Sequence, residues 1–141
     1  MRELFQAAEE NGIAIEYCRL PLNGSVSAPG EKGDFILMDY DLIDSGPSEW
    51  VHLAHELGHC VTGSFYNRYA ALDVRRRHEN RADKWAVKKL LTAEALDEAV
   101  AEGYTEMWEL AERFGVTQEF MEKAVCWYTY GNLDVEEYMR F

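Results

Sequence analysis

The sequence contains no apolar run that approaches the ~20 residues needed to cross a bilayer, which argues against a membrane-spanning helix. Residues 1–5 also lack the basic end and the long apolar stretch of a secretory signal peptide. From these two absences we expect a cytoplasmic protein that does not bind a membrane.

Cysteine is scarce, and its spacing matches no cross-linking or metal-binding pattern. Cys18, Cys60 and Cys126 are odd in number and lack CxxC spacing, so neither a disulfide framework nor a cysteine zinc cluster is expected. Cys60 follows a histidine of the motif described below, but its helical direction turns it away from that side chain. We therefore expect Cys60 to be buried by packing.

Positive charge is also in short supply, with 14 Lys and Arg residues against 26 Asp and Glu and a formal net charge of −12. The negative electrostatic field of such a chain repels phosphate backbones, so we expect no direct nucleic-acid partner. The one cluster of basic residues is interpreted as a solvated helix face, or alternatively as a docking edge for an acidic stretch of substrate. It comprises Arg75, Arg76, Arg77, His78, Arg81, Lys84, Lys88 and Lys89.

The chain does contain enough apolar material for one folded domain. Its 141 residues are 48% hydrophobic and 13% aromatic, which predicts a true core but is too little for two independent domains. We divide this single domain, residues 1–141, into three parts. They are an N-terminal helix with strands (1–46), a pair of motif-bearing helices (47–91) and C-terminal helices (92–141).

Local patterns predict the order of the elements. Helices are expected at residues 2–10, 49–61, 76–91, 92–103, 105–114 and 117–130, and strands at 13–18 and 34–39. Ser45 or Ser48 is a candidate cap for the second helix, and residues 19–33 and 64–74 are predicted loops. Strands followed by helices predict an α+β domain, in which a small antiparallel or mixed sheet packs on the helices.

The segment His55-Glu56-Leu57-Gly58-His59 is the strongest chemical signal in the sequence. Side chains four residues apart lie one turn above each other on a helix, so His55 and His59 can direct two imidazoles at one metal ion. Glu56 is offset from both histidines. Its carboxylate therefore falls short of the metal but within reach of a water molecule, where a general base acts.

Two histidines leave a zinc site incomplete, because catalytic zinc usually takes three protein ligands. Glu79 lies twenty positions after His59 (79 − 59 = 20) and is the candidate third ligand. Asp73 and Glu94 are the nearest acidic alternatives. The pattern predicts a zinc hydrolase, with manganese as an alternative metal for two histidines and one carboxylate.

Asp83 follows Glu79 by one helical turn. Its carboxylate can accept the free ring N–H of a ligating histidine, which fixes the tautomer of the ring and raises its basicity. The alternative for Asp83 is a surface pair with Arg76 or Lys84 that contributes little to stability.

Three segments occur in a fixed order along the chain. They are His55-Glu56-Leu57-Gly58-His59, Glu79-Asn80-Arg81-Ala82-Asp83-Lys84-Trp85-Ala86 and Leu110-Ala111-Glu112-Arg113-Phe114-Gly115-Val116-Thr117. Together they resemble the ImmA/IrrE family of small bacterial and phage metallopeptidases, in which the third segment typically reads LAxRFGVS. The similarity spans roughly residues 50 to 125, and three segments in this order are fairly specific.

This resemblance implies a zincin-like fold with a gluzincin-like zinc site, where His55, His59 and Glu79 bind the metal and Glu56 is the catalytic base. It also implies a phage or mobile-element origin. Members cleave a helix-turn-helix repressor and so act as antirepressors, and others belong to toxin–antitoxin pairs. A helix-turn-helix repressor is therefore the expected protein partner.

The chain departs from the family pattern at residues 48–54. In the family, the segment just before the histidine motif is usually basic and contains Phe-Thr. A separate C-terminal sensory domain, found in larger members, is not expected. Residues 104–130 resemble a helix-turn-helix, but two basic residues against five glutamates give a net charge of −3 (2 − 5 = −3). That charge disfavours DNA contact, so the apolar positions of this segment are assigned to the core or to a protein-binding face.

Several features stay open at this level. The donor for a developing oxyanion is not assigned among Tyr66, Tyr69, His78 and Tyr128. His52, one turn before His55, is interpreted as a packed side chain. Substrate is expected to bind as an extra strand on an exposed sheet edge. The alternative functions are a protein-binding module with a structural metal and a zinc amidase for a small molecule.

Overall fold

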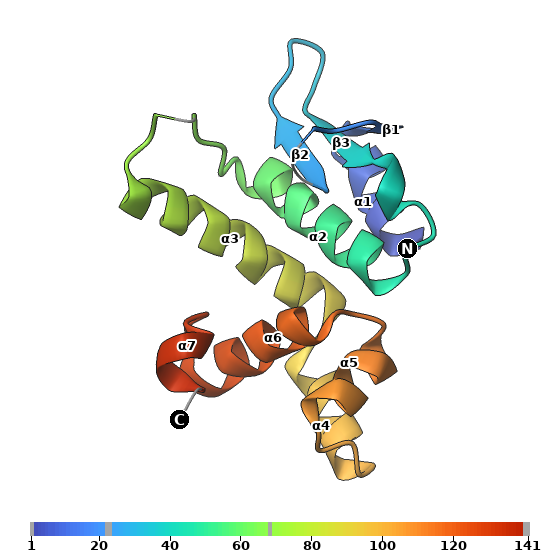
Figure 1. Ribbon diagram of the computed structural model, residues 1–141, viewed down its shortest axis with the longest axis vertical. Helices are drawn as coiled ribbons and strands as arrows, with labels where there is room; N and C mark the ends of the chain where they lie inside the picture. Colours follow the sequence, from blue (N-terminus) through green and yellow to red (C-terminus); the bar gives the residue numbers. More distant parts are fainter. Residues whose placement is uncertain (1, 22–23, 68, 140–141) are drawn as a thin grey trace. The chain divides into compact units, whose positions relative to one another are not determined.

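Figure 1 shows a small sheet and a series of helices in the computed structural model, which describes residues 2–21, 24–67 and 69–139. Within these residues, none of the helices combines the length and the apolar character needed to cross a membrane. The chain forms two compact units, and the boundary between them falls inside one helix, between Ala86 and Val87. The prediction of a single domain stays a prediction.

The first unit contains a mixed three-stranded sheet and confirms the predicted α+β class. Its strands are β1 (Ala14–Cys18), β2 (Ser25–Ala28) and β3 (Phe35–Asp39), in the spatial order β1-β3-β2. Strand β1 runs parallel to β3, and β2 runs antiparallel to it. Strand β2 therefore lies at one edge of the sheet.

One face of this sheet packs against a helix. Ile36 and Met38 of β3 point to that face and are fully buried, and the β2 residues paired with them are Ser27 and Ser25. The helix is α2 (Pro47–Thr62), which packs against β2 and β3, while α1 (Arg2–Glu10) packs against α2 and β1. A 3₁₀ turn, η1 (Tyr40–Leu42), follows β3. The two serines thus face α2.

Strand β2 lies inside the stretch 19–33 that the sequence predicts as a loop, so that prediction is wrong for these four residues. Gly24 before the strand and Pro29-Gly30 after it break any periodic signal. The strand is instead stabilised by its pairing with β3, a non-local contact that local patterns do not contain. Residues 22–23 and 68 of the predicted loops lie outside the described residues.

Helix α2 begins without a serine cap. Gly46 occupies the N-cap position with φ of 74°, no side chain caps the helix, and Pro47 fits its first turn. The hydroxyl of Ser45 donates to a backbone carbonyl of η1 instead, so capping by Ser45 or Ser48 is wrong. The helix ends where Gly63 adopts a left-handed conformation, with φ of 66°.

Helix α3 (Leu72–Leu90) starts before the predicted residue Arg76 and crosses the boundary between the units. Within the first unit its residues Ala82 and Ala86 are fully buried. A Cβ atom on Gly58 of α2 would lie 2.4 Å from the Ala82 carbonyl oxygen. The backbones of α2 and α3 therefore touch at this point, as the two adjacent ribbons in Figure 1 show.

The second unit is helical. It contains α4 (Ala93–Ala101), α5 (Met107–Phe114), α6 (Gln118–Tyr130) and the short α7 (Val135–Tyr138), which the sequence did not predict. Thr92 and Thr117 cap α4 and α6 through their hydroxyls. Helices α5 and α6 pack against each other in the segment predicted to resemble a helix-turn-helix. Their shared apolar residues are Leu110, Ala111, Phe120 and Met121, all buried.

Candidate metal centre

The two motif histidines project from one face of α2. The Nε2 atoms of His55 and His59 lie 3.2 Å apart, and the two rings stand edge to face with centroids 4.8 Å apart. The spacing of four residues on a regular helix produces this arrangement. One cation can therefore contact both nitrogen atoms.

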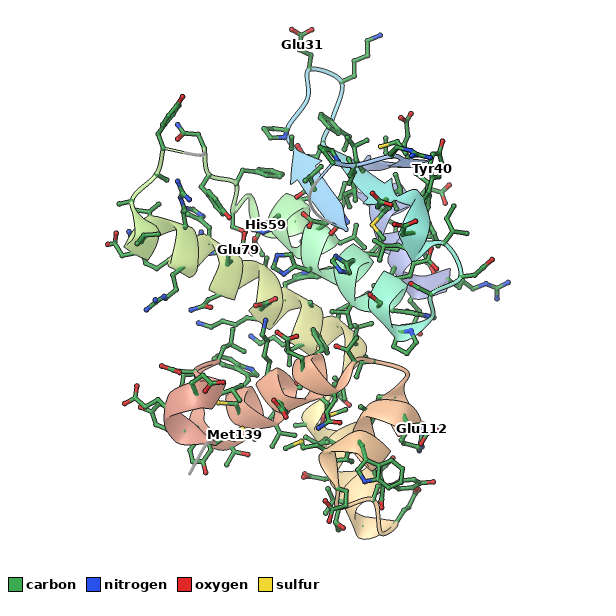
Figure 2. The ribbon with its side chains drawn as sticks, in the orientation of Figure 1. Glu31, Tyr40, His59, Glu79, Glu112 and Met139 are labelled. Carbon is green, nitrogen blue, oxygen red and sulfur yellow. The ribbon has the colours of Figure 1, made fainter. Side chains whose placement is uncertain are left out.

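The third donor comes from α3. Glu79 Oε2 lies 2.7 Å from His55 Nε2, and Glu79 Oε1 lies 3.2 Å from His59 Nε2. Figure 2 shows the labelled His59 and Glu79 on these neighbouring helices. One ligand atom from each of the three residues lies within 4.8 Å of the others, and no other such group of His, Cys, Asp or Glu occurs in the described part of the chain.

The end of α2 fixes the orientation of His59. The left-handed turn at Gly63 lets the Ser64 N–H donate to the His59 carbonyl over 3.0 Å. The same turn brings the Ser64 carbonyl oxygen 2.7 Å from His59 Nδ1. A carbonyl only accepts hydrogen bonds, so Nδ1 carries a proton, and in the neutral form of the ring the lone pair lies on Nε2, which faces Glu79.

Asp83 fixes His55 in the same way. Its Oδ1 atom lies 2.7 Å from His55 Nδ1, and the Asp83 side chain is buried with 8% exposure of the residue. A carboxylate accepts, so His55 Nδ1 is a donor and Nε2 faces Glu79. The predicted role of Asp83 as acceptor for a histidine ring matches this geometry.

The donor atoms fit a divalent metal. Tetrahedral zinc with bonds of ~2.0 Å to nitrogen places its ligand atoms about 3.3 Å apart, close to the observed 3.2 Å between the two Nε2 atoms. Burial lowers the pKa of His55, but hydrogen bonds to Asp83 and Glu79 outweigh burial and raise it to about 10. The histidines and Tyr66 outweigh burial at Glu79 and lower the pKa of its carboxyl. The cluster thus favours a positive charge at its centre, as a proton or as a metal ion.

Glu56 does not join the three ligands. Its carboxylate is buried, with 7% exposure of the residue, and lies on the side of α2 that faces β2. Ser25 donates to Oε2 over 2.8 Å, and Ser27 donates to Oε1 over 2.6 Å. The sequence pattern indicated the offset of Glu56 from the histidines but gave no sign of the two serines, which lie on the unpredicted strand.

His52 is more than a packed side chain. Its Nδ1 atom lies 2.9 Å from Ser25 Oγ, so it contacts the serine that binds Glu56. Burial lowers the pKa of His52, with a smaller effect of His55 in the same direction and an opposing effect of Glu56. The neutral ring is therefore the stable form at neutral pH.

The four candidate oxyanion donors have different surroundings. The Tyr66 hydroxyl donates to Glu79 Oε1 over 2.7 Å and so lies beside the ligand cluster. Tyr69 is 79% exposed, and the Tyr128 hydroxyl donates to the Leu91 carbonyl within the second unit. His78 Nδ1 is buried and lacks a hydrogen-bond partner among the described residues. Tyr66 thus contacts the side chain of a candidate ligand, Glu79.

Comparisons with known proteins address the family. The family model described as the IrrE N-terminal-like domain, which defines a peptidase family, matches residues 8–125. That range contains the histidines of α2, Glu79, all of α5 and α6 as far as residue 125. A comparison with curated proteins gives no match.

Proposed function

Because the chain belongs to the peptidase family of the IrrE N-terminal-like domain, we propose that it is a zinc-dependent endopeptidase that cleaves a helix-turn-helix repressor. One observation carries the proposal. Two imidazole Nε2 atoms and the Glu79 carboxylate converge, while both Nδ1 atoms are committed to other acceptors. His55, His59 and Glu79 are the residues that hold the metal.

The chemistry that zinc supplies in such a site is acidification of water and polarisation of a carbonyl group. Glu56 acts as the general base, takes a proton from the attacking water and passes it to the leaving amine. Its carboxylate belongs to the residue next to His55 but accepts bonds from β2, so it stays separate from the ligands. That separation supports a role in proton transfer.

Tyr66 is the donor that we assign to the substrate carbonyl. Its hydroxyl already bonds to Glu79 Oε1, and hydrogen bonding to Glu79, assisted by burial, raises the pKa of Tyr66 to about 12. The phenol is therefore protonated at neutral pH and can donate to a developing negative charge. Tyr66 is 38% exposed, so a substrate can reach it.

The free edge of the sheet favours an extended peptide as the substrate. Strand β2 has β3 on one side, and no further strand in the described ranges pairs with its other side. A peptide can add to this edge by backbone hydrogen bonds. Because Ser25 and Ser27 of β2 contact Glu56, the added peptide would run beside the base. A peptide segment fits this edge better than a small amide does.

The test uses the zinc-loaded protein and any helix-turn-helix repressor that is encoded beside its gene. Intact-mass spectrometry is expected to show two fragments with the wild type. The variant Glu56→Gln is expected to retain zinc and to leave the repressor whole, because it keeps the ligands but removes the base. Fluorescent casein serves as a second substrate of unrelated sequence.

The alternatives predict other results. If Glu56→Gln binds the repressor and relieves repression as the wild type does, the protein is a binding module with a structural metal. If neither repressor nor casein is cut while small amides are hydrolysed with dependence on Glu56, the protein is an amidase. Either result would replace the endopeptidase proposal.

A further inference from the structure

We infer that Ser25 and Ser27 are positioning residues which hold the Glu56 carboxylate for proton transfer, and that His52 orients Ser25 for this task. The inference rests on the proposed function and deepens it, since it assigns three side chains to the base. None of them belongs to the motif that suggested the chemistry. Two come from the edge strand β2, and His52 lies one turn before His55 on α2.

Both oxygen atoms of the Glu56 carboxylate are engaged. Ser25 and Ser27 are two residues apart on β2, so their side chains leave the same face of the strand. Each hydroxyl reaches a different oxygen, Oε2 over 2.8 Å and Oε1 over 2.6 Å. Two bonds at two oxygens prevent the carboxylate from rotating about its terminal bond, which a single bond would allow. Each oxygen still has a lone pair for a water molecule.

The proton count of Ser25 assigns the tautomer of His52. A hydroxyl has one proton, and Ser25 gives it to Glu56, since an ionised carboxylate only accepts. The Ser25 oxygen must then accept from His52 Nδ1, 2.9 Å away, so the ring is protonated at Nδ1. The bonds therefore run in one direction, from His52 to Ser25 to Glu56. His52 keeps the Ser25 proton pointed at the carboxylate.

The backbone at Gly24 lies close to the ring of His52. A Cβ atom on Gly24 would lie 2.7 Å from His52 Cε1, so the residue just before β2 approaches the ring closely. A larger residue at this position would push His52 away from Ser25. The absence of a side chain at Gly24 thus lets His52 reach Ser25, which in turn bonds to Glu56.

These contacts link the sheet edge to the base. The strand that offers a free edge to a peptide is the same strand that holds the carboxylate. Loss of a serine hydroxyl should leave peptide binding to the β2 backbone unchanged but let Glu56 rotate. We therefore expect an effect on kcat and little effect on KM.

The experiment compares Ser25→Ala, Ser27→Ala and Ser27→Thr with the wild type. The substrate is a quenched-fluorescence peptide selected from a random-sequence mixture that the wild type cuts. We expect kcat to fall roughly 10- to 100-fold in each alanine variant, with KM and zinc content close to those of the wild type and with a cooperative thermal transition that stays above the assay temperature. Ser27→Thr keeps the hydroxyl and suits a strand, so it should restore kcat.

His52 has its own pair of variants. His52→Asn retains an N–H near the position of Nδ1 and should keep most of kcat, whereas His52→Leu should lower kcat as Ser25→Ala does. The matched control is Ser45→Ala, which removes a hydroxyl that bonds to the Leu42 carbonyl. Wild-type kcat in both serine variants would overturn the inference. So would a loss of kcat that Ser27→Thr does not restore or that parallels a loss of zinc.

A second measurement separates this inference from the proposed function. Urea unfolding of the single and double variants Ser27→Ala and Glu56→Met shows whether the two side chains are coupled. Removal of the hydroxyl should cost less stability when the carboxylate is already absent. Additive effects would overturn the inference whether or not any peptide is cut. Failure of the wild type to cut any substrate would count against the endopeptidase alone.

Discussion

Gly58 contacts the backbone of Ala82, so that a Cβ atom on Gly58 would lie 2.4 Å from the Ala82 carbonyl oxygen and 2.9 Å from its Cα atom. This contact joins the helix that carries the two histidines to the helix that carries Glu79. Ala82 is fully buried at the contact. Gly58 and Ala82 therefore set the distance between the two helices, and with it the distance between the histidines and Glu79.

Gly58→Ala tests this contact. The added methyl group meets backbone rather than a flexible side chain, so α2 and α3 must separate. We expect a loss of about 1–3 kcal/mol in the free energy of unfolding and weaker zinc binding, because Glu79 moves with α3. Urea unfolding and competition with a zinc chelator measure the two effects. The control is Val61→Ala, which changes an exposed residue of the same helix. Equal losses of stability and zinc affinity in the two variants would contradict the prediction.

Asp83→Asn tests the acceptor that holds His55. The amide can no longer accept as a charged group at the 2.7 Å contact, so the ring loses orientation and basicity. Zinc affinity should fall about 10- to 100-fold without a loss of the fold. The matched control is Asp73→Asn in the first turn of the same helix. Unchanged zinc affinity in Asp83→Asn, measured by chelator competition, would remove Asp83 from the site.

The pairing of His55 with His59 and of Glu79 with Asp83 was predictable, because helical periodicity encodes it. Residues four apart on a helix share a face, which placed His59 beside His55 and Asp83 beside Glu79 before any fold was known. The class of fold followed from strands that precede helices. These features depend on neighbours within a few residues, which the sequence shows directly.

The partners of these residues were not predictable in the same way. Ser64 acts through its backbone carbonyl, which has no residue-specific signal. Ser25 and Ser27 lie in a strand that exists because β3 pairs with it, and the short stretch is bounded by glycine and proline. Their contact with Glu56 spans about thirty residues of sequence (56 − 25 = 31), so no local pattern records it.

Removal of the metal should lower the stability of the protein. The three side chains converge in the folded chain, a geometry that the unfolded chain lacks, so a metal ion binds the folded state more tightly than the unfolded one. Zinc at a free concentration 100-fold above Kd should stabilise the fold by about 2.7 kcal/mol, and excess EDTA should reverse this gain. Thermal unfolding with and without zinc measures the shift.

Glu79→Ala should abolish that zinc-dependent shift, because it removes one of three ligands. Glu94→Ala, which changes one of the two acidic alternatives in the sequence, should keep the shift intact. The reverse pattern, a shift retained in Glu79→Ala and lost in Glu94→Ala, would show that the ligand set is misassigned.

Tyr17→Phe tests a buried contact of the first unit at high pH. The Tyr17 hydroxyl donates to the buried Glu49 carboxylate over 2.6 Å. Burial, together with the hydrogen bond and the charge of Glu49, raises the pKa of Tyr17. The stability from this raised pKa is fully present below the unfolded pKa of about 10 and is lost as pH rises through the higher folded pKa.

At pH 7 we expect Tyr17→Phe to lose about 1–3 kcal/mol, since Glu49 keeps its burial but loses its donor. Above pH ~10 the wild type should lose stability faster than the variant does, because Tyr17 releases its proton in the unfolded chain while the folded protein keeps it protonated beside Glu49. Urea unfolding between pH 7 and 11 gives both values. The difference between the two proteins should therefore shrink with rising pH, and a difference that stays constant would mean that the hydroxyl does not bond to Glu49.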